Sequence, residues 1–72
     1  MSVFFKYVGP VEDVNGMTVR YKSGRKTVEI GPIYHNETQF EVVHKKAIEY
    51  FDSHPHYERA DGKTEKVIYY NE

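Results

Sequence analysis

Apolar side chains alternate with polar ones in several stretches of the chain, and this period of two residues predicts β-strands. Near the start, Val3, Phe5 and Tyr7 would share one face of an extended segment. Glycine and proline residues divide the chain into short pieces, which indicates turns between the strands. We expect strands over residues 3–14, 17–22, 26–30 and 65–70.

Two dipeptides predict hairpin turns between the first three strands. Asn15-Gly16 tolerates the positive φ angles of a type I′ turn, and Ser23-Gly24 favours a second two-residue turn. The second turn would place Lys22 opposite Arg25. The first three strands would then form an antiparallel meander, joined by the C-terminal strand.

A longer segment with helical periodicity follows the third strand. Asn36 can cap a helix N-terminus, Glu37 would complement the helix dipole, and Pro55 would end the helix. We therefore expect a helix over residues 37–53. Its apolar stripe would consist of Phe40, Val43, Ala47, Tyr50 and Phe51.

These elements predict an α+β fold for a single domain over residues 1–72. One amphipathic helix would pack on an antiparallel sheet of three to four strands, which is either open or curled into a small barrel. The apolar residues support a sheet-rich fold, because the chain has seven tyrosines and four phenylalanines but no tryptophan. Aromatic and β-branched side chains suit a pleated, half-buried surface.

Composition excludes several classes of function. The chain has 72 residues, no cysteine and a formal net charge of −1. It therefore cannot form disulfides or cysteine metal sites, and it lacks the strong positive charge of a dedicated nucleic-acid coat protein. Its apolar runs are too short for a membrane span or a signal peptide, so we expect a soluble chain with no membrane partner.

The sequence offers no convincing catalytic, cofactor or metal site. His54 and His56 could approach one metal ion, with His44 or His35 as a third ligand, but Pro55 separates the pair and surface histidines near a helix end explain the pattern as well. The acidic residues fall at turns or on the helix surface, and no phosphate-binding glycine pattern is present. We expect no enzyme activity and assign no cofactor.

Positive charge concentrates at one end of the second hairpin. Four basic residues surround Tyr21 there, namely Arg20, Lys22, Arg25 and Lys26. They could contact an acidic protein surface, or hold phosphates while a neighbouring aromatic ring stacks on a base. Basic residues at a hairpin end can also simply solvate it and protect its edge from pairing.

Aromatic and apolar residues fall on both faces of the predicted sheet, and a single helix can cover only one of them. The candidates for an uncovered, protein-binding face are Phe4, Val8, Ile68 and Tyr70. Either a barrel hides these side chains or another subunit covers them, and with a core this thin we expect partial exposure.

Three segments resemble small virion structural proteins of tailed bacteriophages. They are the opening strand with its Gly-Pro stop (residues 5–11), the Thr27-Val28-Glu29-Ile30 strand after the basic hairpin, and His54-Pro55-His56-Tyr57-Glu58 after the helix. The resemblance implies a building block of a phage head, neck or tail that docks to many copies of a larger protein. It implies no catalytic residues.

The sequence thus predicts a non-enzymatic assembly module of a phage virion. It would dock through sheet edges and aromatic anchors, and it would reside in the virion after assembly in the host cytoplasm, or otherwise in the cytoplasm. One alternative is a small nucleic-acid-binding or regulatory module that uses the basic hairpin end. Another is an adaptor or inhibitor of a host protein.

Overall fold

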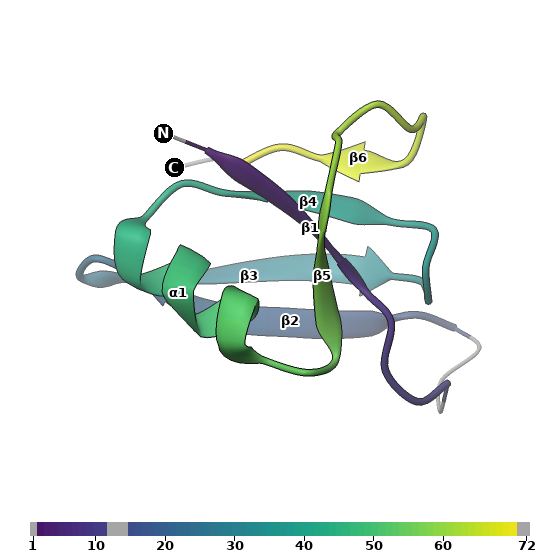
Figure 1. The fold of residues 1–72 in the computed structure, drawn as a ribbon, viewed down its shortest axis with the longest axis horizontal. Helices are drawn as coiled ribbons and strands as arrows, with labels where there is room; N and C mark the ends of the chain where they lie inside the picture. Colours follow the sequence, from purple (N-terminus) through teal and green to yellow (C-terminus); the bar gives the residue numbers. More distant parts are fainter. Residues whose placement is uncertain (1, 12–14, 71–72) are drawn as a thin grey trace.

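A computed structural model describes residues 2–11 and 15–70 of the chain, and it has the expected α+β fold. One helix and two sheets enclose a common core (Figure 1). The elements are β1 (Val3–Tyr7), β2 (Met17–Ser23), β3 (Lys26–Ile33), β4 (Gln39–Val42), α1 (Lys45–Ser53), β5 (Tyr57–Ala60) and β6 (Val67–Ile68).

The larger sheet has the strand order β5-β1-β4-β6 and is open. Its strand β1 pairs antiparallel with both neighbours, so that Phe5 lies between Phe40 of β4 and Arg59 of β5. The short β6 runs parallel to β4. The expected meander is therefore wrong, because β1 pairs with distant strands rather than with β2. Within the described residues the sheets also do not close into a barrel.

The second sheet is the β2–β3 hairpin, whose expected register is wrong by two residues. Ser23 lies opposite Lys26, so the turn consists of Gly24 and Arg25, with Gly24 at a φ of +66°. Lys22 consequently faces Thr27 instead of Arg25. A shift of two residues keeps every side chain on the same face of its strand, and Val19 and Ile30 lie opposite each other on the buried face.

The helix is half as long as expected. It begins at Lys45, and residues 39–42 of the expected helix form strand β4 instead. Asn36 does not cap the helix but occupies a turn with a φ of +56°, and its amide donates a hydrogen bond to the Tyr7 carbonyl. The residue at the cap position is His44, whose side chain makes no capping hydrogen bond.

Two other expected strands are shorter in the structure. The first ends at Tyr7 rather than at residue 14, and residues 12–14 lie outside the described part of the chain. The last covers only Val67–Ile68 rather than residues 65–70. Strand β5 (Tyr57–Ala60) follows the helix and was not among the expected strands.

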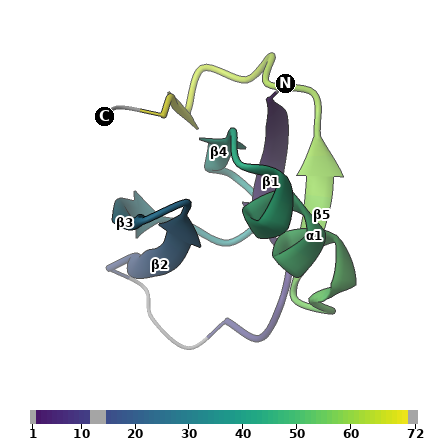
Figure 2. The same ribbon diagram turned by 90° about the vertical axis from the view of Figure 1, so that its left-hand side faces the viewer.

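Aromatic rings fill the core between the two sheets and the helix. Phe51 of α1 is fully buried, and its ring centroid lies 5.3 Å from that of Phe40 and 4.8 Å from that of Tyr57. Figure 2 shows α1 beside β5, on the opposite side from the β2–β3 hairpin, and the helix packs against β5 and against β2. The buried apolar residues are Phe5, Val19, Tyr21, Ile30, Ile33, Phe40, Val42, Ala47, Ile48 and Phe51.

Candidate functional site

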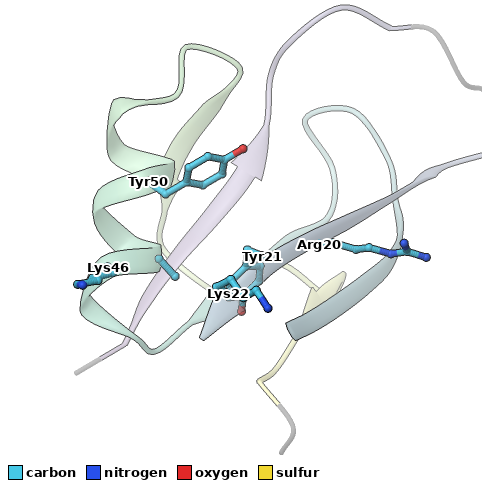
Figure 3. Close-up of a pocket in the computed structure, with 6 residues that line it drawn as sticks. Arg20, Tyr21, Lys22, Lys46 and Tyr50 are labelled. Carbon is cyan, nitrogen blue, oxygen red and sulfur yellow. The ribbon is translucent and has the colours of Figure 1, made fainter. Parts of the chain in front are cut away.

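A hollow of about 330 Å³ lies between β2 and α1. Figure 3 shows Arg20, Tyr21 and Lys22 on the strand and Lys46 and Tyr50 on the helix. We call this hollow the basic groove, and its lining residues are Arg20, Tyr21, Lys22, Lys46, Ala47 and Tyr50.

The strand side of the basic groove is the free edge of β2. Arg20 and Lys22 are exposed on one face of the strand, whereas Tyr21 points to the opposite face and is buried. Successive side chains of a strand point to opposite faces. Arg20, Tyr21 and Lys22 can therefore all line one hollow only if the hollow borders the backbone edge of β2. Within the described residues, β2 pairs with β3 alone, so its other edge is open toward the groove.

The helix side combines a small floor residue with an exposed aromatic ring. Ala47 is buried and leaves space, while Tyr50 is 52% exposed. The Tyr50 ring is supported edge-on by the rings of Phe51 and His54, at centroid distances of 5.1 and 5.6 Å. This support orients a large, amphipathic ring at the rim of the groove.

The end of the hairpin lies close to the start of the helix and fixes the geometry of the groove. A Cβ atom added to Gly24 would lie 3.6 Å from the His44 ring, at ordinary contact distance. The turn between β2 and β3 therefore lies beside the residue that precedes α1. β2 ends and α1 begins near this point, and the hollow lies between the two elements.

The charge on the groove is positive. Arg20 forms an ion pair with Glu29 across the hairpin, at 3.1 Å between Nε and Oε2. Lys22 and Lys46 form no ion pair with any residue in the described part of the chain. Two lysine side chains at the rim are therefore free of ion pairs with the carboxylates of residues 2–11 and 15–70.

Tyr21 has a structural role beneath the groove. Its hydroxyl donates a hydrogen bond to the Glu41 carbonyl at 3.2 Å. Burial, aided by electrostatic repulsion from Tyr70 and Glu41, raises the pKa of Tyr21 from 10.0 to about 12. The phenol therefore stays protonated near neutral pH and holds the hairpin to the larger sheet.

The structure separates the four basic residues that the sequence grouped. Arg20 and Lys22 line the basic groove, whereas Arg25 and Lys26 are exposed at the hairpin turn and do not line it. Lys46 joins the first pair from the helix, and sequence reasoning missed it. The same reasoning placed Tyr50 in the apolar stripe, although the ring is largely exposed.

The four expected interface residues are half-buried by the chain itself. Gly62 lies against the Phe4 ring, and Tyr69 meets that ring edge-on at 5.9 Å. The amide of Tyr70 donates a hydrogen bond to the Glu41 carboxylate at 3.0 Å. The C-terminal segment therefore covers the sheet face that the helix leaves open.

The other two expected interface residues do not form one surface with Phe4. Ile68 packs against the core, and Val8 follows the opposite end of β1. The Val8 amide donates a hydrogen bond to the His56 carbonyl at 2.7 Å. Phe4 and Val8 thus lie at different ends of the same strand.

The histidine pair near the helix end lies among aromatic rings. The ring centroids of His54 and His56 are 5.2 Å apart, and the His56 amide donates a hydrogen bond to Nδ1 of His54 at 3.1 Å. Among residues 2–11 and 15–70, no three histidine, aspartate or glutamate side chains are grouped closely enough to hold a metal ion.

Comparisons with protein-family models, curated proteins and solved structures find no match to this chain. No helix in the described part of the chain is long and apolar enough to cross a membrane. The groove itself is therefore the basis for a functional proposal.

Proposed function

We propose that this chain is a non-enzymatic docking module that binds a larger protein through the basic groove. The observation that carries the proposal is the edge of β2 that pairs with no other described strand. It is bordered by the exposed Tyr50 ring and by two lysines that form no ion pair with a described residue. A free strand edge offers backbone donors and acceptors that a second polypeptide can satisfy.

The composition of the groove suits a protein interface. Tyrosine and arginine are enriched among the residues that dominate binding energy, and Tyr50 and Arg20 lie on opposite sides of the hollow. A partner that covers Tyr50 would bury a ring that is now 52% exposed. The positive rim would favour an acidic partner and speed its association.

The resemblance to small phage structural proteins suggests that this docking takes place in a phage virion. In that setting the partner is a head, neck or tail protein present in many copies. The docking proposal rests on the groove and does not depend on the phage setting.

A second candidate function is binding of single-stranded nucleic acid at the same groove. Lys22, Lys46 and Arg20 could hold phosphates while a base stacks on Tyr50. Binding of this kind would weaken steeply with salt concentration. The net charge of −1 and the open strand edge favour the protein partner.

Site-specific photo-crosslinking tests the proposed function. A photoreactive phenylalanine analogue replaces Tyr50 in the groove or, as a control, the exposed Tyr34 outside it. In the cells that naturally produce the chain, we expect one defined protein to crosslink from position 50 and not from position 34. Crosslinking to nucleic acid alone, or to no macromolecule, would contradict a protein-docking function.

A further inference from the structure

We propose that the basic groove binds an extended acidic segment, which adds to β2 as a new strand and carries two acidic residues separated by one apolar residue. This inference rests on the proposed docking function and specifies the chemistry of the partner. Three features of the groove support it: the strand edge, the spacing of the charges and the apolar floor.

The strand edge sets the conformation of the partner. β2 extends over Met17–Ser23, pairs with β3 on one side and borders the hollow on the other. Backbone N–H and C=O groups along an open edge pair best with a second extended backbone. A nucleic acid has no backbone N–H groups to match them, which is why we favour a polypeptide.

The spacing of the charges sets the two acidic positions. Arg20 and Lys22 lie two residues apart on the same exposed face of β2, so their Cα atoms are separated by about 6.6 Å along the strand. Residues two apart on an added strand have the same spacing and point to the same face. Two carboxylates at those positions would lie opposite Arg20 and Lys22.

The apolar floor sets the residue between them. The partner residue opposite Tyr21 would point to the inner face of the added strand, toward the hollow. Ala47 forms the floor of that hollow and Tyr50 its rim, so an apolar or aromatic side chain fits there. Lys46 lies on the helix side, and Figure 3 shows its side chain directed away from β2, so its charge adds only longer-range attraction for an acidic segment.

A second copy of this chain does not supply such a segment. The eleven acidic residues of the sequence include no two that are separated by exactly one residue. The pattern that the groove selects is therefore absent from these 72 residues, and a second copy of them is not the proposed occupant.

Selection from a random peptide library tests this inference. The full chain serves as the bait, and the short peptides that bind to it are recovered and sequenced. We expect enrichment of an acidic–apolar–acidic pattern. Enrichment of basic or uncharged peptides, or of acidic residues without this spacing, would overturn the inference.

Titration of the selected peptide against matched variants locates the site. Lys22→Glu should weaken binding by at least about tenfold, because the charge reversal repels the partner carboxylate. Lys63→Glu makes the same change at an exposed lysine outside the groove and should leave the affinity unchanged. Equal losses in both variants would overturn the assignment to this groove.

Two further probes separate strand addition from other modes of binding. The selected peptide with alternate backbone nitrogens methylated cannot donate the edge hydrogen bonds, and it should bind at least about tenfold more weakly in one of the two methylation registers. A labelled oligothymidine should bind more weakly than the peptide. Unchanged binding after methylation in both registers, or tighter binding of the oligothymidine, would overturn the inference.

Failure of this inference is distinguishable from failure of the proposed function. If position 50 crosslinks to a protein but the library yields no such pattern, docking stands and the strand-addition inference is wrong. If position 50 crosslinks to no protein, the docking function itself is wrong.

Discussion

The Tyr21 hydroxyl donates a hydrogen bond to the Glu41 carbonyl at 3.2 Å and so joins the hairpin to the larger sheet. The two sheets share no backbone pairing within the described residues, so this bond and the packing of the shared core hold the hairpin against the larger sheet. We expect Tyr21→Phe to lower the free energy of unfolding by about 1 kcal/mol. Urea unfolding at neutral pH measures the change, and an unchanged midpoint would show that apolar packing alone holds the hairpin.

The raised pKa of Tyr21 also predicts a loss of stability in alkaline solution. The folded chain holds the phenol proton up to about pH 12, whereas the unfolded chain releases it near pH 10.0. Because the folded state binds the proton more tightly, its stability is complete below pH 10 and falls as the pH rises toward 12. Urea unfolding across this range should show a shallower decline for Tyr21→Phe, and the remaining decline is expected from Tyr57, whose pKa burial also raises.

Gly62 fixes the C-terminal segment over the sheet. Its φ is +69°, and an added Cβ would lie 2.8 Å from the Phe4 ring. Gly24 has a similar φ of +66° but an open contact of 3.6 Å, so Gly24→Ala is a matched control for backbone strain alone. We expect each alanine to cost about 1 kcal/mol for the left-handed backbone and Gly62→Ala to cost more. Equal thermal unfolding of the two variants would contradict a tight fit at Phe4.

The ion pair between Asp52 and Arg59 joins α1 to β5. Arg59 donates two hydrogen bonds to the Asp52 carboxylate, at 2.8 and 2.6 Å. These bonds hold the pKa of Asp52 below its ordinary value of 3.8. The stabilisation is therefore complete above pH 3.8 and is lost as the pH falls through the lower folded value.

Asp52→Asn should make the stability of the chain less dependent on pH in this acidic range. Glu49→Gln removes a carboxylate from the same helix that has no ion pair with a described residue, and it is the control. Unfolding followed by circular dichroism at several acidic pH values makes the comparison. An identical acid profile for Asp52→Asn and the unmodified chain would contradict a role for the ion pair.

Neighbouring aromatic residues on α1 should have separable effects. Phe51 is fully buried, so Phe51→Ala should cost about 3–5 kcal/mol, much of the stability of a domain of this size. Tyr50 is 52% exposed, and Tyr50→Ala should keep the fold and weaken partner binding. Circular dichroism and titration with the selected peptide test both variants. A folded Tyr50→Ala variant with full affinity would contradict the role of this ring in docking.

Local sequence patterns predicted the positions of the strands better than they predicted which strands pair with each other. The alternation of apolar and polar residues predicted strands over 17–22 and 26–30, and both are present, because alternation depends only on neighbouring residues. No local signal indicates that β1 pairs with β4 and β5. Those contacts join segments far apart in the sequence, and the burial of Phe5 and Phe40 in the shared core accounts for them.

The error at the helix start has a specific cause. Gln39-Phe40-Glu41-Val42 alternates polar and apolar residues and is a strand, but Phe40 and Val43 also fit a helical stripe with Ala47. Asn36 then looked like a cap, although asparagine also tolerates the positive φ that it adopts here. The longer predicted helix placed Tyr50 in the core, so the aromatic rim of the groove was missed.

Half of the candidate groove could be predicted from the sequence. Arg20 and Lys22 belong to the hairpin and were found from local charge. Lys46 and Tyr50 come from a separate element, and only the packing of α1 beside β2 brings them to the same hollow. Arg25 and Lys26 carry similar charge but lie at the turn, so charge alone could not separate them from the groove.

Amide hydrogen exchange of the full chain, with and without the selected acidic peptide, tests the central claim most directly. Strand addition predicts that alternate amides of β2 exchange at least about tenfold more slowly when the peptide is bound, because they gain hydrogen bonds to its backbone. Slower exchange elsewhere with no change along β2 would contradict the claim that a partner docks at this edge.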